Sequence, residues 1–298
     1  MTNNRKALTY GLATVAIWST VASAFKIALR HMDPLQLLLV ACAASIAALG
    51  GILLAQGNLD KLFGMERREA ARCALLGALN PFLYYIILFQ AYDLLPAQEA
   101  QPINYTWAVT LSLLSVPLLG QKMSLKDLAA ILLSYFGVVV ISTHGDLPAL
   151  DFSSPAGVAL ALGSTIIWAL YWIFNTRSKA DPMAGLLLGF LFGFPLILAA
   201  TLVFSELPTL TTESLLAATY VGFFEMGVTF ALWITAMKYA ALPDGGGTAR
   251  VANLIFLSPF LSLVFIHFLV GEDILPATVA GLGFIIAGNA LMQYKRRA

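Results

Sequence analysis

A single carboxylate stands in the middle of an apolar stretch in the second half of the chain. Glu225 lies within the segment 222–227, GFFEMG, whose remaining five residues are all apolar or glycine. An ionised side chain at the centre of a membrane helix costs about 2.5–3.5 kcal/mol on insertion scales, so it normally faces a cavity or a partner. Glu225 is therefore a candidate contact for a substrate ammonium group or for a coupling proton. The structural alternative is a protonated Glu225 hydrogen-bonded to a neighbouring helix.

The Asn80-Pro81 pair interrupts another apolar stretch. Proline removes a backbone donor and disfavours helical geometry in the preceding residue, so a helix is expected to break at Asn80. Inside a membrane, the freed carbonyl groups need partners within the protein or in a wet cavity. The pair predicts either a hinge at Pro81 that brings Asn80 to a substrate site, or a static packing kink. Tyr84 follows Asn80 by four residues and would share its helix face.

Polar and aromatic side chains share one helix face at the start of a third apolar stretch. Gln101, Asn104 and Tyr105 recur at the i, i+3, i+4 spacing, and Trp107 follows them. Because lipid offers no hydrogen bonds, this face is expected to point into the protein. For Tyr105 and Trp107 the alternative is an aromatic belt at the depth of the lipid headgroups.

Two further tryptophans complete the set of candidate substrate contacts. Trp18 and Trp168 each lie near the middle of an apolar stretch, where a headgroup belt fits poorly, and Tyr171 and Trp172 follow Trp168 closely. Aromatic faces of this kind can stack against a planar, apolar part of a small molecule. They predict a cavity wall, with ordinary helix packing as the alternative.

Membrane helices are the elements that must position these residues. The 298 residues are 59% hydrophobic and 11% charged, whereas soluble domains carry about 25% charged residues. The mean hydropathy is +0.83. A membrane helix needs about 20 apolar residues, and the apolar runs do not alternate with polar residues as barrel strands do. We predict an all-α integral membrane protein with ten transmembrane helices, at 8–28, 35–56, 73–94, 100–119, 127–143, 157–175, 184–205, 215–237, 250–269 and 275–293.

The distribution of basic residues predicts the orientation of these helices. With a cytoplasmic N-terminus, only Lys26 and Arg30 of the 17 Lys and Arg residues fall on the outer side. The cytoplasmic set includes Lys295, Arg296 and Arg297 at the end of the chain. Because cytoplasmic loops are enriched in Lys and Arg, we predict that both termini are cytoplasmic.

The two halves of the sequence resemble each other at offsets of 145–151 residues. Asp33-Pro34 corresponds to Asp181-Pro182, and further pairs share the same order: Gly77 with Gly222, Asn80 with Glu225, and Gly137 with Gly288. We therefore predict two repeats, 1–148 and 149–298. Five helices per repeat is an odd number, so the second repeat is inverted relative to the first. Transporters with inverted repeats bind substrate near the membrane midplane, at the interface between the repeats, and work by alternating access.

The repeats resemble the drug/metabolite transporter superfamily, in its EamA-type ten-helix branch. The likeness covers nearly the whole chain and rests on three features of each repeat. The first helix carries a Trp (Trp18 and Trp168), and the fifth carries a glycine (Gly137 and Gly288). A Gly-Gln or Gly-Glu pair follows the fourth helix (Gly120-Gln121 and Gly271-Glu272). The segments 103–107, INYTW, and 115–119, SVPLL, together with Asn80-Pro81, resemble exporters of aromatic amino acids within that branch. This resemblance implies export of aromatic and other neutral amino acids across the inner (plasma) membrane of a bacterial-type cell.

The expected mechanism follows from these residues and from the resemblance. An amino acid would enter a central cavity from the cytoplasm, stack on the aromatics and contact Glu225, Asn80 and Gln101. Helices would then rearrange at Pro81 and, in the second repeat, at Gly222 and Gly227. The sequence has no nucleotide-binding motif and no metal-ligand cluster, so we expect no cofactor and no metal. The expected partners are the small-molecule substrate and membrane lipids, without nucleic acid, and the protein is expected to be monomeric.

Three other functions remain open at this stage. The same fold could export drugs or another small metabolite. A channel would more naturally use filter loops or charged rings from an oligomer. An enzyme would need a nucleophile–base pair or metal ligands within reach of each other. The three histidines, His31, His144 and His267, all lie near predicted membrane boundaries, and the sequence has no H-E-x-x-H motif.

Overall fold

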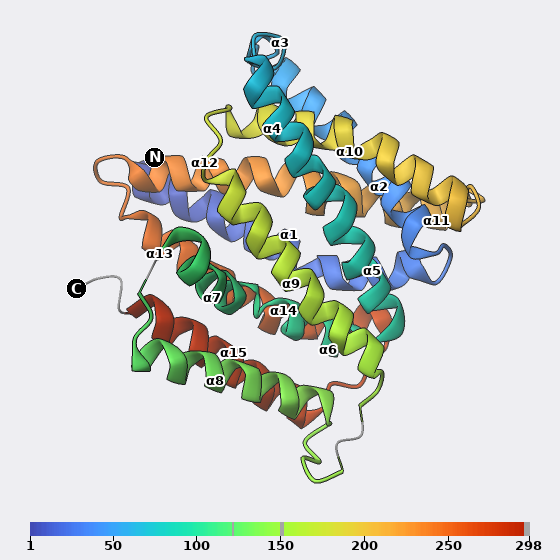
Figure 1. Ribbon diagram of the computed structural model, residues 1–298, viewed down its shortest axis with the longest axis vertical. Coiled ribbons are helices and arrows are strands. Elements are labelled where there is room, and N and C mark those ends of the chain that lie inside the picture. Colours follow the sequence, from blue (N-terminus) through green and yellow to red (C-terminus); the bar gives the residue numbers. More distant parts are fainter. Residues whose placement is uncertain (121, 150–151, 295–298) are drawn as a thin grey trace. The chain divides into compact units, whose positions relative to one another are not determined.

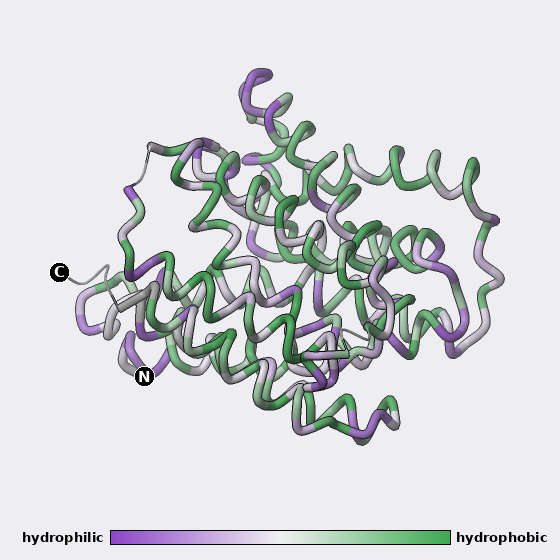
Figure 2. Tube along the Cα trace, turned by 60° about the horizontal axis from the view of Figure 1, so that its bottom comes forward, coloured by the Kyte–Doolittle hydropathy of each residue, from purple (hydrophilic) through white to green (hydrophobic). Residues whose placement is uncertain are grey.

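The computed structural model describes residues 1–120, 122–149 and 152–294, and within them it contains helices and no strands. Gln121 and the basic residues 295–297, which the sequence predictions used, lie outside this described part. Figure 2 shows hydrophobic residues along most of the helices and hydrophilic residues gathered near helix ends and turns. Nine helical segments of the described chain are long and apolar enough to cross a membrane: Asn3–Leu29, Pro34–Ala55, Arg67–Leu94, Ala97–Leu119, Leu125–Ser142, Pro155–Asn175, Pro182–Phe204, Thr212–Ala241 and Arg250–Val270.

These nine segments coincide with the first nine predicted spans, which confirms an all-helical chain suited to a membrane. At the tenth predicted span the apolar helix is shorter, Pro276–Leu291. Ten membrane crossings, the inverted repeats and the cytoplasmic termini remain predictions.

The helices form two compact units, and the first consists of Met1–Phe82 and Ser178–Val270. Its α-helices, labelled in Figure 1, are α1 (Asn3–Leu29), α2 (Pro34–Ala55), α3 (Asp60–Phe63), α4 (Arg67–Gly77), α10 (Pro182–Phe204), α11 (Thr212–Tyr220), α12 (Thr229–Ala241), α13 (Thr248–Ala252) and α14 (Ser258–Phe265). Two π-helical segments, η2 (Val221–Val228) and η4 (Ile266–Val270), and a 3-10 segment, η3 (Asn253–Leu257), complete it. In this unit α1 packs on α12 and α14, α10 packs on α2 and α4, and α2 packs on η2.

The second unit consists of Leu83–Arg177 and Gly271–Ala298. Its helices are α5 (Tyr84–Leu94), α6 (Ala97–Asn104), α7 (Trp107–Leu119), α8 (Leu125–Ser142), α9 (Pro155–Asn175) and α15 (Pro276–Tyr294). α8 packs along α15, and α9 contacts α5, α6 and α7. The chain passes between the units within η1 (Ala78–Leu83), a π-helical segment. Each unit therefore contains helices from both predicted repeats.

Corresponding Asp-Pro pairs begin α2 and α10. Asp33 and Asp181 are the N-caps, each with a proline at the first helical position, where the missing N–H costs nothing. The Asp181 carboxylate accepts hydrogen bonds from the backbone N–H groups of Met183 (3.1 Å) and Ala184 (3.3 Å), and Lys61 Nζ lies 3.2 Å from its second oxygen. Partial burial raises the pKa of Asp181, but these hydrogen bonds and the Lys61 charge outweigh it and hold the pKa below its ordinary value.

Asp181→Ala is therefore expected to lower the melting temperature at pH 7, because the cap and its ion pair contribute about 0.5–2 kcal/mol. A lowered folded-state pKa contributes stability that is present above the unfolded-state pKa and is lost as the pH falls through the folded-state value. The difference from the unsubstituted protein is thus expected to shrink towards about pH 3, as followed by thermal unfolding in detergent. Asp60→Ala, at an exposed residue of α3, is the control. A difference that is the same at both pH values would contradict the prediction.

Among the described residues, glycines at close helix–helix contacts include two reciprocal pairs. A methyl group added at Gly77 would overlap the carbonyl oxygen of Gly189, and one at Gly222 would overlap that of Ala41. Gly77 and Gly222 correspond in the predicted repeats, and Ala41 and Gly189 are 148 residues apart, the offset of the Asp-Pro pairs. Gly189 of α10 thus lies at a close backbone contact with Gly77 of α4.

The second reciprocal pair joins α8 and α15. A methyl group at Gly137 would overlap the carbonyl oxygen of Gly281, and one at Gly288 would lie 2.6 Å from that of Ala130. Gly137 and Gly288 are 151 residues apart in the sequence, and so are Ala130 and Gly281. The contacts are therefore exchanged between the two halves of the chain.

Candidate functional site

The predicted helix break at Asn80 is confirmed. Asn80 has φ −141° and ψ 114°, an extended backbone, between α4 and the helical turn that leads into α5. The side chain is 2% exposed, and neither its amide nitrogen nor its amide oxygen has a hydrogen-bond partner. Gly193 of α10 brings its backbone against Gly77 and Pro81. A buried, unpartnered donor and acceptor are thus held side by side in a segment that is apolar enough to cross a membrane.

Glu225 lies half-buried in η2, which takes the place in the second half of the chain that η1 takes in the first. The Thr229 hydroxyl donates to the carbonyl oxygens of Phe224 and Glu225, the latter at 2.9 Å. Such bonds from Thr to carbonyls one turn earlier compete with regular helix geometry. Gly222 and Gly227, the other predicted hinge residues, both fall in η2, where they pack against Ala41 and Ala48 of α2.

Trp18 of α1 belongs to an aromatic group within the first unit. Its ring lies 5.6 Å from Trp233 and 6.5 Å from Phe230, both on α12. Two residues further along α1, Thr20 Oγ1 and the Tyr220 hydroxyl are 2.6 Å apart. The first unit therefore contains three of the predicted substrate contacts: Trp18, Asn80 and Glu225.

The second unit brings Tyr84 of α5 and Trp168 of α9 together. Their rings are stacked at 4.5 Å, and Tyr171 continues the stack at 5.5 Å from Trp168, while Trp172 stands edge-on at 5.7 Å. Stacked and edge-to-face rings at these distances attract each other beyond their buried area. Trp168 itself is half-buried. The dense aromatic cluster expected around Trp168 is present.

α6 carries the predicted polar face next to these aromatics. The Asn104 amide donates to Ser164 Oγ of α9 at 3.0 Å, and the Tyr84 hydroxyl lies 3.5 Å from the Asn104 oxygen. Gln101 is 4% exposed, and its amide oxygen has no partner. Tyr105 is half-buried at the end of α6.

The predicted span 100–119 is interrupted within the described structure, which the sequence interpretation missed. α6 ends at Asn104 and α7 begins at Trp107, and between them the Thr106 hydroxyl bonds the Ile103 carbonyl at 2.8 Å. Trp107, half-buried, is therefore the first residue of a separate helix. Asn289 of α15, also missed, lies with its amide nitrogen 3.5 Å from the Tyr105 carbonyl oxygen.

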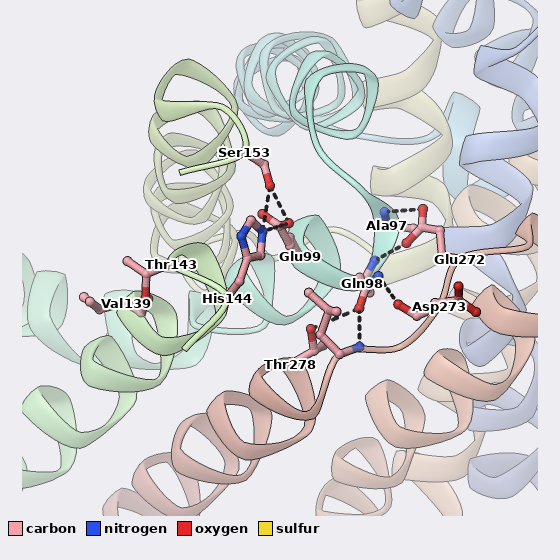
Figure 3. Close-up of polar contacts among 11 residues, drawn as sticks. Ala97, Gln98, Glu99, Val139, Thr143, His144, Ser153, Glu272, Asp273 and Thr278 are labelled. Atoms are coloured by element: carbon pink, nitrogen blue, oxygen red, sulfur yellow. Dashed lines mark hydrogen bonds and ion pairs between the residues drawn. The ribbon is translucent and has the colours of Figure 1, made fainter. Parts of the chain in front are cut away.

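Two neighbouring residues at the start of α6 also carry buried polar groups that the sequence interpretation did not use. Gln98 is 6% exposed and Glu99 is 1% exposed, and Figure 3 shows them linked to residues near the starts of α9 and α15. The sequence signal that could have identified them is a Gln and a Glu side by side directly before an apolar run. Within the described residues, no three His, Cys, Asp or Glu side chains are grouped in a way that could hold a metal ion.

Comparisons with known proteins place this structure in a family. The model of the EamA-like transporter family matches residues 5–143 and again residues 155–294. An uncharacterized transporter of Bacillus subtilis, YvbV, is 27% identical over 95% of this chain and 90% of its own length. A probable amino-acid metabolite efflux pump of Escherichia coli is 26% identical over 96% of this chain and 94% of its own.

A solved crystal structure shares the fold. Its TM-score is 0.67 at 20% sequence identity, and the match covers 99% of this chain and 98% of the other. The helices suited to membrane spans and the two matches of the family model agree with one another. The chain therefore belongs to the EamA-like transporter family.

Proposed function

We propose that this transporter exports amino acids, aromatic and other neutral ones, by alternating access across the inner membrane of a bacterial cell. The observation that carries the proposal is the Asn80 side chain, which is buried in a membrane segment with both amide atoms unpartnered. A buried polar group without a hydrogen-bond partner costs about 1–3 kcal/mol of stability. A role in binding substrate would explain why the protein carries this cost at Asn80. A substrate that offers both a hydrogen-bond donor and an acceptor, as an α-amino acid does, could pair with both amide atoms of Asn80.

Alternating access is supported by the reciprocal glycine contacts. Exchange of the same contacts between positions 145–151 residues apart is what a pseudo-two-fold axis would produce. Two matches of one family model, at 5–143 and 155–294, agree with two repeats. With five predicted helices in each, the repeats would be inverted, and such transporters work by rocking or gating of one repeat against the other.

The π-helical segments η1 and η2 supply places where helices could rearrange. They occupy corresponding positions, and each contains predicted hinge residues, Pro81 in η1 and Gly222 and Gly227 in η2. The candidate substrate contacts of this proposal are Asn80, Glu225 and Trp18 among the residues of the first unit. Among the residues of the second unit they are Tyr84, Gln101, Tyr105, Trp107 and Trp168. The amino-acid class is supported by the Escherichia coli relative's description. Efflux of drugs or another metabolite is the alternative on the same fold.

Uptake of radiolabelled phenylalanine into proteoliposomes tests the proposal, with unlabelled amino acids as competitors. Trp168→Ala is expected to lower uptake about tenfold, because an aromatic contact contributes up to about 1.5 kcal/mol. Glu225→Gln is expected to lower uptake and, if this carboxylate carries the coupling proton, to remove the effect of a pH gradient.

Glu213→Gln is the matched control, because the Glu213 side chain is 78% exposed. It is expected to transport normally. Saturable uptake that only aromatic and neutral amino acids inhibit supports the proposed substrate class. Folded protein without uptake above that of empty liposomes would overturn that class and favour drugs or another metabolite.

A further inference from the structure

Three side chains from distant parts of the chain meet at the start of α6 (Figure 3). The Ser153 hydroxyl donates to Glu99 Oε1 at 2.7 Å, and His144 Nε2 lies 2.9 Å from the same oxygen and 2.8 Å from Ser153 Oγ. Glu99 is 1% exposed, and its second oxygen, Oε2, is buried without a partner. The His144 side chain is 38% exposed, so solvent reaches the group through the imidazole.

The helix that carries Glu99 is held in place by a second set of bonds. The Glu272 carboxylate accepts from the backbone N–H groups of Ala97 (2.8 Å) and Gln98 (3.0 Å), at the N-terminus of α6. The Gln98 amide donates to the Asp273 carbonyl and accepts from Leu275 N–H and the Thr278 hydroxyl. These bonds hold the N-terminus of α6, and Glu99 with it, against the segment 272–278.

The surroundings of this group are acidic. The described segments between helices here, 95–96, 143–149, 152–154 and 271–275, contain Asp146, Glu272 and Asp273 and no Lys or Arg. Asp93 near the end of α5 is also acidic, and the sequences of α9 and α15 contain no charged residue. A positive charge placed here would meet carboxylates and no competing cation in these segments.

We propose that Glu99, His144 and Ser153 form a proton-binding site that fastens His144, just after α8, and Ser153, just before α9, to α6. An ionised carboxylate only accepts hydrogen bonds, so His144 Nε2 carries a hydrogen towards Glu99 and Nδ1 is the free base. A proton from solvent binds Nδ1, and the neutral hydrogen bond becomes an ion pair. That ion pair compensates the charge of the buried Glu99 carboxylate through Oε1, while Oε2 stays without a hydrogen-bond partner. In the predicted topology this end of the second unit faces the outside of the cell.

The site can be tested without a transport assay, so its failure is distinguishable from failure of the proposed function, on which it does not depend. The chain has three histidines, and the double variant His31→Gln/His267→Gln leaves His144 as the single imidazole. Nuclear magnetic resonance of ring-labelled protein in nanodiscs then reports its protonation. We expect the Nε2–H tautomer at pH 8 and a doubly protonated ring at pH 5. A neutral ring at pH 5, or the Nδ1–H tautomer at pH 8, would overturn the proposal.

Thermal unfolding of the full chain provides the second readout. The ion pair forms when His144 is protonated, so it adds stability at pH 5 that is lost as the pH rises to 8. We expect this component to raise the melting temperature by about 2–4 °C. This pH-dependent rise in melting temperature is expected to be absent in His144→Gln and Glu99→Gln. His31→Gln is expected to retain it, because His31 and Glu213 form a more exposed pair at 3.6 Å. Equal pH responses in all three variants and the unsubstituted protein would overturn the proposal.

Discussion

Gly222→Ala is expected to abolish stable packing of η2 on α2, with loss of most folded protein. The added methyl group would overlap the backbone carbonyl oxygen of Ala41, which no side-chain rotation can relieve. Overpacking of a tight interface costs about 1–3 kcal/mol and more where backbone must shift. Gly77→Ala is expected to have the same effect, because its methyl group would overlap the Gly189 carbonyl oxygen. Size-exclusion profiles and melting temperatures in detergent measure both losses.

Two other glycines of membrane helices provide matched controls. Gly50 in α2 and Gly163 in α9 have no atom within 4 Å of where a methyl group would stand. Alanine is expected to leave stability unchanged there or to raise it, since Ala is favoured over Gly within a helix by about 0.5–1 kcal/mol. A Gly222→Ala protein as stable as Gly163→Ala would show that α2 and η2 do not touch in this way.

The same measurements separate packing from hinge motion at Gly222. A glycine that serves only as a hinge would, when substituted, change the transport rate and leave the melting temperature unchanged. A glycine at a close backbone contact changes stability first. The contact with Ala41 makes the packing role of Gly222 a property of the structure, and the hinge role stays a prediction.

The features that could be predicted from the sequence are those with local causes. Membrane helices follow from apolar length, and the break at Asn80 follows from the proline beside it. The corresponding π-helical segment near Gly222 has no proline and could be located only by comparing the two halves of the chain. The interruption before Trp107 was missed, because hydroxyl bonds such as that of Thr106 to an earlier carbonyl also occur in helices that continue, as at Thr165 in α9.

The contacts within the candidate site could not be predicted in the same way. Trp168 stacks on Tyr84, 84 residues earlier, and Glu99 meets His144 across 45 residues. Helix periodicity shows which residues share a face, but it does not show which faces meet. The sequence therefore pointed to Tyr84 and Trp168 as candidate residues and missed Glu99, and in both cases the partner follows only from the way the helices pack.

Asn80→Leu is expected to stabilise the protein and at the same time impair transport. Leucine has the same number and branching of side-chain heavy atoms as asparagine, with bulkier methyl groups, and it removes two buried polar atoms that have no partners. The expected gain is about 1–3 kcal/mol for the unmet groups. If these atoms bind the substrate, its two hydrogen bonds are lost, and uptake is expected to fall about tenfold. Melting temperature and phenylalanine uptake, measured on the same preparation, give the two results.

Asn104→Leu separates this expectation from a general effect of replacing a polar residue in the membrane. The Asn104 amide is bonded to Ser164 and lies near the Tyr84 hydroxyl, so its loss leaves partners unmet and is expected to lower the melting temperature. Opposite stability changes in the two variants would identify Asn80 as a residue kept for function at a cost in stability. Normal transport by the Asn80→Leu protein would show that Asn80 is part of a static packing kink. It would also remove the main support for a role of Asn80 in substrate binding.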